Sequence, residues 1–501
     1  MVVQHNMQAA NANRMLNVTT SAQSKSTEKL SSGYRINRAA DDAAGLTISE
    51  KMRKQIRGLD QASTNAQDGV SSVQTAEGAL TEVHSMLQRM NELATQAANG
   101  TNSKDSDRQA IQDEIDQLTT EIDRVSETTK FNETYLLKGE DGTKTINMKA
   151  HDAGLKGKLT DNGDGTATFV MDTLNAGDKV SIGGKSYTIG SDDAEVDKWF
   201  TDNGNDVKDA ATKKVTVNGT EYTYYAAKAA NTTAGSLTDG WNAGWYASAP
   251  TDKGDGTGTA LSGKFADVDA IKAEVKKGAT VQNGTKSVTG MNDTTPKDGV
   301  SDTDATVISK NKAYELASKE LLKANQIGDT EGKAKVGTSA NVDTAVDLTN
   351  GDGTFSIKVG QAKVANSLAF SLHVGADADM TNKIQVNIDA MDSASLGIKG
   401  LNVKDDSGNA ATYAVDAISD AISKVSSQRS SLGAVQNRLE HTINNLDNVV
   451  ENTTTAESRI RDTDMAEEMV NYSKNNILAQ AGQSMLAQAN QSNQGVLSLL
   501  Q

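Results

Sequence analysis

The sequence predicts an α+β protein, with a long antiparallel helical coiled-coil rod built from both chain ends and a β-rich outer domain inserted between them. In both terminal regions, apolar residues recur at alternating steps of three and four, which places them on one stripe of a helix. The middle of the chain instead holds short β-type runs, both Pro residues and all three Trp. A stripe kept over many heptads is a seam for another helix, so we expect lengthwise association.

Composition narrows the possible functions. The 501-residue length suggests about two to four domains. An aromatic fraction of 4% favours long, thin packing of aliphatic side chains over one large core. A net charge of -16 argues against a nucleic-acid partner, because phosphate binding needs clustered Lys and Arg. The absence of Cys excludes disulfides and thiolate chemistry. No apolar run approaches the roughly 20 residues of a membrane span, and no cleaved signal peptide is indicated.

The N-terminal region predicts three helices in order. Residues 1–40 are polar with scattered apolar residues and fit a weak amphipathic helix. Residues 44–98 fit one long helix, which Ala98-Asn99-Gly100 ends. Ser106 to Gln109 spells a capping box for the next helix. Its apolar positions are Ile111, Ile115, Leu118, Ile122 and Val125. The short loop between these two helices makes them antiparallel neighbours.

The middle region changes composition near Lys138. The runs Lys214–Val217 and Thr220–Tyr225 flank Asn218-Gly219, which is a strong hairpin signal. A helical stretch is expected from Asn311 to Ala324. The element Gly-Asp-Gly-Thr occurs three times, at 163–166, 254–257 and 351–354, and suggests weakly repeated subdomains. We expect one or two small β-rich domains over residues 139–365.

The C-terminal region returns to the helical pattern after a pair of strands. The strands are expected at Phe370–Val374 and Ile384–Ile388, followed by a third rod helix over 410–452. A final helix could begin at Thr454–Glu457 or at Asp464–Glu467, since both segments spell capping boxes. The chain ends in an apolar tip that needs to be covered.

Signals of catalysis or metal binding are weak. The five His are scattered, and none forms the paired motif of a helix-borne zinc site. Ser26 to Lys29 spells S-x-x-K without its partner motifs. Asp161 to Thr166 looks like a calcium loop, but the Glu at its twelfth position is missing, which favours a β-turn. We therefore expect no enzyme activity, no metal site and no cofactor.

The helices need partners. One helix cannot offset its ordering entropy alone, so the three rod helices are expected to share a seam. The terminal segments are poorer in large apolar residues and are expected to need other copies of the chain. A rod whose ends are completed only by copies of itself makes a heterologous contact, which grows into a filament.

Several sequence blocks then point to a family. On the N-terminal side they are Leu30–Leu46, Ala76–Leu80, Gln88–Ala94 and Glu121–Val125, and on the C-terminal side Leu432–Leu439 and Val496–Leu500. In these blocks the chain resembles bacterial flagellin, the subunit of the flagellar filament. The resemblance covers about 1–138 and 366–501, and 139–365 corresponds to the variable, outward-facing insert of that family.

The resemblance implies a division of labour. Residues 1–40 would pair with 460–501 as the innermost helical layer, while 41–138 and 366–459 would form the rod. The implied polymerisation residues are Leu16, Leu30, Ile36, Ile477, Leu478, Met485, Leu486, Val496, Leu497, Leu499 and Leu500. The protein would be extracellular and exported without a cleaved signal peptide, with an export chaperone on its C-terminal helix. Filament cap and hook-junction proteins would be further partners.

The resemblance also implies binding to the animal innate receptor Toll-like receptor 5. The receptor-binding residues of the family map onto Gln88, Arg89, Leu93, Ala94, Ile111 and Glu114. The chain departs from the family pattern at Asn91, where Arg is common, and at Thr95, where Val is common. Loss of a cation would weaken any charge-assisted contact there, so the sequence leaves the strength of receptor signalling open. Arg89 could also be a polymer contact, and the two roles are compatible.

Two alternative functions stay open. A hook–filament junction protein would share this architecture but would cap growth and not propagate it. A filament subunit could also carry an adhesive or enzymatic insert.

Overall fold

The computed structural model describes residues 6–103, 106–208, 214–228, 240–250, 262–294, 297–338, 353–405 and 407–498. The chain divides into two compact units, and both ends of the chain contribute to the first. Unit 1 comprises Met1–Thr75, Ala369–Asn387 and Ser430–Gln501, and unit 2 comprises Ala76–Leu368 and Ile388–Arg429.

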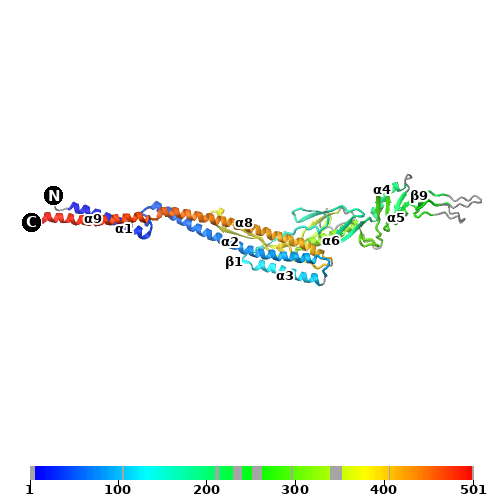
Figure 1. Cartoon of the computed structure of the whole chain (residues 1–501), viewed down its shortest axis with the longest axis horizontal. Helices are drawn as coiled ribbons and strands as arrows, with labels where there is room; N and C mark the ends of the chain where they lie inside the picture. The colour runs from blue at the N-terminus through cyan, green and yellow to red at the C-terminus, as the bar shows by residue number, and fades with distance from the viewer. Residues whose placement is uncertain are drawn as a thin grey trace, which may run out of the picture. The chain divides into compact units, whose positions relative to one another are not determined.

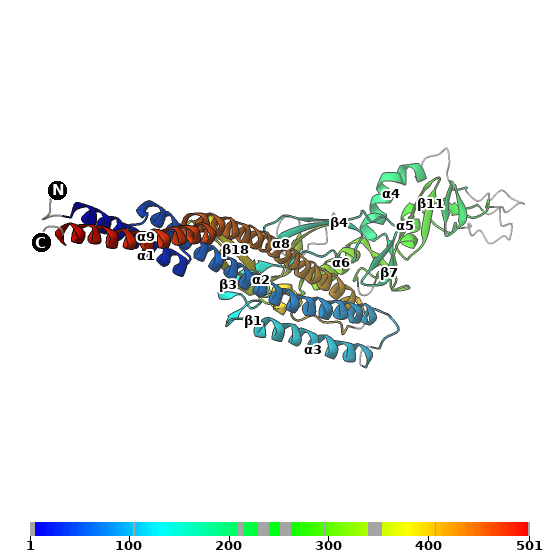
Figure 2. The same ribbon diagram turned by 60° about the vertical axis from the view of Figure 1, so that its left-hand side comes forward.

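In unit 1 the terminal helices pair. Helix α1 (Met7–Ser32) and helix α9 (Met465–Ser498) lie side by side and run in opposite directions (Figure 1, Figure 2). The Asn6 side chain accepts a hydrogen bond from the Ala9 amide at 2.9 Å, which caps α1, and donates to the Ala489 carbonyl of α9 at 3.2 Å. The predicted pairing of the chain ends is confirmed.

Two long helices continue unit 1 and extend into unit 2. Helix α2 (Ala43–Ala97) matches its predicted range, whereas α8 (Asn409–Arg461) runs nine residues past its predicted end at 452. In unit 1, Leu59 and Ala62 of α2 pack with Leu446 of α8 in one buried cluster. The Ser63 hydroxyl donates to the Asp447 carboxylate at 3.1 Å beside this cluster. The seam predicted from the heptads is therefore a contact between the two ends of one chain.

The predicted strand pair is also confirmed. Strands β17 (Leu368–His373) and β18 (Lys383–Ile388) pair in a two-stranded sheet, and the short 3-10 helix η2 (Met380–Asn382) precedes β18. Val374 and Ile384 join Ala66 and Leu439 in a buried cluster, so these strands cover the seam of α2 and α8. The Asn65 side chain donates to the His373 carbonyl at 3.0 Å and holds the pair in place.

The start of α9 decides between the two caps left open by the sequence. Helix α8 runs through Thr454–Glu457 without a break, so that alternative is wrong. The Asp464 carboxylate instead accepts from the amides of Ala466 and Glu467, at 2.9 and 3.1 Å. Next to it, Tyr34 pairs with Asp462 in a β-bridge and the Arg461 guanidinium lies 4.6 Å from the Tyr34 ring.

In unit 2, helix α3 (Asp107–Thr128) folds back along the last turns of α2 (Figure 2). Ile111, Ile115 and Ile122 are buried on its inner face, as the heptad spacing predicts. The predicted capping box is wrong, because the Ser106 side chain makes no capping bond. The Ser103 hydroxyl accepts from the Asp107 amide instead, at 3.4 Å. A small hairpin follows, with strands β1 (Lys130–Phe131) and β2 (Thr134–Tyr135).

The middle of the chain in unit 2 contains a first insert core around helix α6 (Lys310–Asn325), which confirms the helix predicted there. Phe169 and Phe355 are buried in it, with ring centroids 6.3 Å apart. One sheet has the order β14-β15-β5-β4 and another β13-β7-β6. Their bounds are β4 Gly157–Asp161, β5 Thr166–Met171, β6 Lys179–Ile182, β7 Lys185–Gly190, β13 Val307–Ser309, β14 Lys335–Thr338 and β15 Thr354–Lys358.

A second insert core uses separate residues. Val196, Trp245 and Val281 are buried in it, between a five-stranded sheet of order β10-β9-β8-β11-β12 and two helices. The predicted hairpin at Asn218-Gly219 is confirmed, and both turn residues have the positive φ that a type I′ turn requires. The bounds are α4 Asp193–Lys208, β8 Lys214–Val217, β9 Thr220–Tyr225, β10 Gly244–Tyr246, α5 Val268–Val275, β11 Thr280–Asn283 and β12 Lys286–Thr289.

The remaining elements of unit 2 join the first insert core to α8. Strands β3 (Glu140–Asn147) and β16 (Gln361–Asn366) pair, and the short helix α7 (Ser393–Leu396) packs on β16. Of the three Gly-Asp-Gly-Thr segments, the first is the β4–β5 turn, whereas 254–257 lies outside the described residues and so do the first two residues of 351–354.

Candidate polymerisation and receptor surfaces

Helix α9 carries an uncovered apolar surface, which we call the α9 surface. It consists of Met469, Val470, Ile477, Leu478 and Met485, and the exposed fraction is 69% for Val470 and 67% for Ile477. A groove lies between Lys474 and four of these side chains, those of Met469, Val470, Ile477 and Leu478. Soluble proteins rarely expose a contiguous row of large aliphatic side chains unless it binds a partner.

The polymerisation residues inferred from sequence differ in exposure. Ile477, Leu478 and Met485 are exposed, whereas Leu30 and Leu486 are half-buried. Leu16 packs against α9 of its own chain, where a Cβ on Gly482 would lie 3.3 Å from the Leu16 Cδ1. Ile36 is only 2% exposed, in the segment before α2, so its own chain already covers it. The side chains of Val496, Leu497, Leu499 and Leu500 lie outside the described residues.

Sequence reasoning missed part of the exposed surface. Met469 and Val470 extend the α9 surface toward the start of the helix, and Met15 and Val18 are exposed on α1. The spacing of Val470 and Ile477 is one heptad, which was a usable signal. It was weak because neighbouring Tyr, Ser and Asn residues interrupt the stripe.

The receptor residues implied by the resemblance meet at the contact of α2 with α3 and fall into two layers. Leu93, Ala94 and Ile111 are buried, and Gln88, Arg89 and Glu114 are exposed.

The exposed layer is fixed by ion pairs. The Arg89 guanidinium donates to Glu114 at 2.9 Å and to Glu92 at 3.2 Å. These hydrogen bonds, above all the one to Glu114, raise the pKa of Arg89 and keep its charge in place. The Arg89 guanidinium is therefore held beside two carboxylates on the exposed surface.

The two departures from the family pattern sit beside this layer. The Thr95 hydroxyl donates to the Asn91 carbonyl at 2.8 Å, within the helix. Among the described residues, the Asn91 side-chain oxygen is buried without a hydrogen-bond partner. Neither residue adds a charge to the exposed layer.

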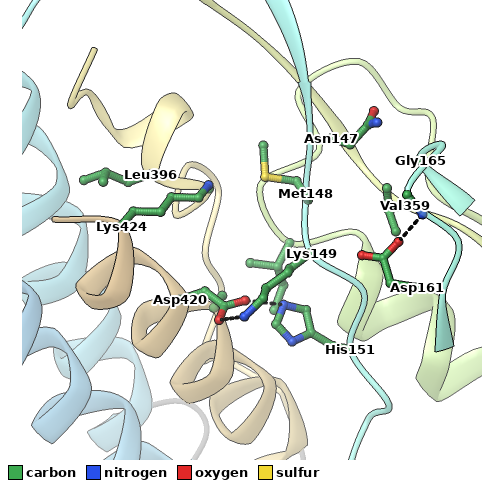
Figure 3. A pocket seen from close by; sticks show the side chains of 14 residues that line it. Asn147, Met148, Lys149, His151, Asp161, Gly165, Val359, Leu396, Asp420 and Lys424 are labelled. Atoms are coloured by element: carbon green, nitrogen blue, oxygen red, sulfur yellow. Dashed lines mark hydrogen bonds and ion pairs between the residues drawn. The ribbon is translucent and has the colours of Figure 1, made fainter. Parts of the chain in front are cut away.

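A cavity of about 190 Å³ lies in unit 2 between the first insert core and α8 (Figure 3). Lys149 lies 2.9 Å from the Asp420 carboxylate, and the His151 Nε2 lies 3.8 Å from its other oxygen. The Asp161 carboxylate accepts from the Gly163 amide at 2.8 Å, as the predicted β-turn requires. The Asp161 and Asp420 carboxylates that line the cavity are therefore both engaged by neighbouring groups.

The described residues contain no group of three or more His, Cys, Asp and Glu side chains arranged to hold a metal ion. No helix in that part of the chain is both long and apolar enough to cross a bilayer. Paired terminal helices with an uncovered apolar surface are typical of a structural protein that assembles.

Comparison with known proteins identifies the family. The model of the bacterial flagellin N-terminal helical region matches residues 3–141, and that of the C-terminal helical region matches 415–500. Flagellin of Clostridium tyrobutyricum is 37% identical over 497 residues, which are 99% of this chain and 100% of that protein. Flagellin of Bacillus subtilis is 33% identical over 501 residues, covering all of both chains. This chain therefore belongs to the bacterial flagellin family.

The family gives the function at a coarse level. Flagellins are structural subunits that assemble into the extracellular flagellar filament for motility, and they are not enzymes. The resemblance read from the sequence blocks at both ends is confirmed.

Proposed function

We propose that this chain polymerises through the α9 surface, with other copies of the chain as the partner that covers it. The exposure of Ile477 and its four neighbours carries the proposal. Fully burying a large aliphatic side chain contributes about 1.5 to 3 kcal/mol, so covering this row supplies a substantial part of an assembly interface. The half-buried Leu30 and Leu486, and the apolar tip from Val496 to Gln501, would complete it. Ile36 would act indirectly, by fixing the segment between α1 and α2.

Substitution on α9 tests the proposal. Ile477→Asp should abolish seeded filament growth, because it would place a carboxylate in a dry interface. Gln480→Asp adds the same charge at an exposed position outside the α9 surface and should leave growth within about twofold, since a solvated charge costs little. Sedimentation and electron microscopy give the readout. Equal growth by both variants would refute the α9 surface as the interface.

Removal of the chain end is the second test. A chain lacking residues 496–501 should assemble more weakly while circular dichroism shows its rod helices folded. Loss of helical signal in the same variant would mean that these residues stabilise the monomer.

Seeded growth also separates the two filament-related functions. A filament subunit adds continuously to short fragments, whereas a hook–filament junction protein adds once and stops. The full-length identity to flagellins favours the subunit.

We propose the following roles for the parts of the chain. Residues 1–40 and 460–501 form the inner layer, 41–138 and 366–459 form the rod, and 139–365 faces outward. Export occurs without a cleaved signal peptide, and a chaperone covers the α9 surface until assembly. Cap and hook-junction proteins contact the filament ends. An insert with adhesive or enzymatic activity stays the alternative. A screen of residues 139–365 that finds neither ligand binding nor hydrolysis would exclude that alternative.

We also propose that Toll-like receptor 5 contacts Gln88, Arg89 and Glu114, with Leu93, Ala94 and Ile111 supporting them from beneath. The exposed ion pair of Arg89 with Glu114 supports this assignment. Arg89→Ala should lower receptor signalling by monomers about tenfold, as expected for a lost charge-assisted contact. Asn91→Arg should raise it. Glu82→Ala, exposed on the same helix, is the matched control, and an equal loss there would refute the assignment.

A further inference from the structure

The chain contains six Asn-Gly pairs, and hydrogen bonds restrain those that the structure describes to very different degrees. They begin at Asn99, Asn162, Asn203, Asn218, Asn283 and Asn350, of which Asn350 lies outside the described residues. Asn-Gly is the dipeptide most prone to spontaneous deamidation, because Gly offers no side chain to hinder attack by its own amide. The structure decides which pair can react.

Four of the five described pairs are restrained. Asn203 is buried in α4, where its amide donates to the Trp199 carbonyl at 3.0 Å and accepts from Lys286 at 2.8 Å. Asn218 accepts from the Thr280 amide at 2.8 Å, which ties the hairpin turn to β11. At Asn162 the attacking Gly163 amide is already bonded to Asp161. Asn283 is the last residue of the β11–β12 ladder and pairs with Lys286.

The pair Asn99-Gly100 is different. It lies in the exposed loop between α2 and α3, outside any helix or ladder. Within the described residues, neither the Asn99 Nδ2 nor the Gly100 amide donates a hydrogen bond. The only hydrogen bond of the Asn99 side chain in that part of the chain is a long one of 3.3 Å from the Thr101 amide. A Cβ built on Gly100 would meet nothing within 4 Å, which shows that the loop has room to rearrange.

We propose that Asn99 is a site of spontaneous covalent modification, at which the side-chain amide is lost and a carboxylate is created. The Gly100 backbone nitrogen, after losing its proton, attacks the Asn99 Cγ. The new C–N bond closes a succinimide as the Cγ–Nδ2 bond breaks and ammonia leaves with that proton. Water then opens either carbonyl of the ring and gives aspartate or isoaspartate. Water is the only co-reactant.

The position gives the reaction a consequence. The new carboxylate lies just after the last turn of α2, where the helix dipole disfavours a negative charge. The Asn99 carbonyl also accepts from the buried Arg108 at 3.4 Å, and isoaspartate lengthens the backbone at that point by one carbon. A filament subunit outside the cell keeps the modified residue for as long as the subunit itself persists.

Peptide mapping of the aged full-length protein tests the proposal, with the other pairs as controls in the same sample. In mildly alkaline buffer, Asn99 should convert about tenfold or more faster than Asn218 and Asn283, since those must first open locally. In denaturant the rates at all five sites should converge, because the sequence at each reacting bond is the same. Gly100→Ala should slow Asn99 about tenfold without loss of stability, since the loop has room for the methyl group.

Two outcomes would overturn the proposal. One is conversion of Asn218 or Asn283 as fast as Asn99 in the folded protein. The other is an Asn99 rate that Gly100→Ala leaves unchanged, which would exclude attack by the Gly100 nitrogen.

Discussion

At the scale of single residues, Arg108 shows how much one side chain can join. It is only 2% exposed. Its guanidinium donates to the Ala97 carbonyl at the end of α2 at 2.9 Å and to the Asp405 carbonyl before α8 at 2.7 Å. The end of one helix is thereby tied to the start of another that lies about three hundred positions away in the sequence. Sequence reasoning could not identify this role, because nothing local to Arg108 indicates Asp405.

We expect Arg108→Met to destabilise unit 2 by about 2 to 3 kcal/mol, because it keeps the aliphatic stem but leaves buried carbonyls without donors. Arg124→Met is the matched control. Arg124 is exposed and pairs with Glu121 on the same helix, so its loss should cost less than about 1 kcal/mol. Urea unfolding followed by circular dichroism gives the comparison. Equal midpoints for the two variants would contradict the role of Arg108.

At Glu133, in contrast, a substitution is expected to raise the stability of the protein. It occupies the β1–β2 turn with φ +68°, a left-handed conformation that costs a non-Gly residue about 1 kcal/mol or more. Glu133→Gly should therefore raise the free energy of unfolding by about 1 kcal/mol. Gln117→Gly, at an exposed position inside α3, should lower it by a similar amount. A thermal melt in which both variants lose stability would show that the turn is not strained.

At the scale of elements, helix ranges followed from periodicity, whereas helix ends depended on contacts. The α2 range matched because Gly100 follows its last turn. The end of α8 was misplaced because Thr454–Glu457 spells a start signal that its continuous heptads override. The capping box at Ser106 failed for a related reason, since the hydroxyl of Ser103 occupies that role. The hairpin predicted at Asn218-Gly219 was correct because the conformation of a two-residue turn depends on the turn residues themselves.

The contribution of Asp405 to the start of α8 can be tested by varying the pH. Burial alone would raise the pKa of Asp405, but hydrogen bonds from Ser407 and from the amides of Ala410, Gly408 and Asn409 outweigh it, so the pKa lies below its ordinary value. A carboxyl whose pKa is lowered by folding stabilises the protein above its unfolded pKa of about 3.9, and loses that effect as the pH falls through the folded pKa.

Asp405→Ala should therefore cost about 1 kcal/mol at neutral pH, the usual loss for a helix cap. The difference from the unmodified protein should shrink on acidification below about pH 4. Asp405→Asn can still accept hydrogen bonds but carries no charge, so it should lose less at neutral pH, and its difference from the unmodified protein should change over the same acid range. Urea midpoints across the acid range give the measurement. A loss that stays constant down to the lowest pH would rule out the charge as its cause.

At the scale of the whole molecule, the sequence showed that both ends must share a seam, since neither stripe can be buried alone. It left open whether the insert was one domain or two. The described residues of the insert form two cores with no buried residue in common. Their separation could not be read from spacing, because the order of strands in a sheet is set by long-range pairing. The exposure of the α9 surface could not be predicted either, since an apolar stripe in the sequence does not show which neighbouring element covers it.

The second insert core is joined to the first through neighbouring chain segments. The Ser191 amide donates to the Thr289 carbonyl at 3.1 Å, and the Met291 amide donates to the Ser191 carbonyl at 3.0 Å. Deleting residues 192–290 and joining Ser191 to Met291 through a short Gly-Ser linker should therefore leave the first insert core folded. An exposed ion pair between Lys297 and Asp193 is lost, which costs little.

This shortened chain should still form filaments, because the α9 surface and the seam of α2 with α8 in unit 1 include none of the deleted residues. Electron microscopy should show filaments with less material at their outer surface. Deleting Gly157–Met171 is the control, since it removes the fully buried Ala167 and Phe169 from the first insert core. That core should then be unfolded, which limited proteolysis would show as rapid cleavage. If removing 192–290 stopped assembly in chains whose circular dichroism stays native, the second core would belong to the polymer contact and the α9 surface would be insufficient.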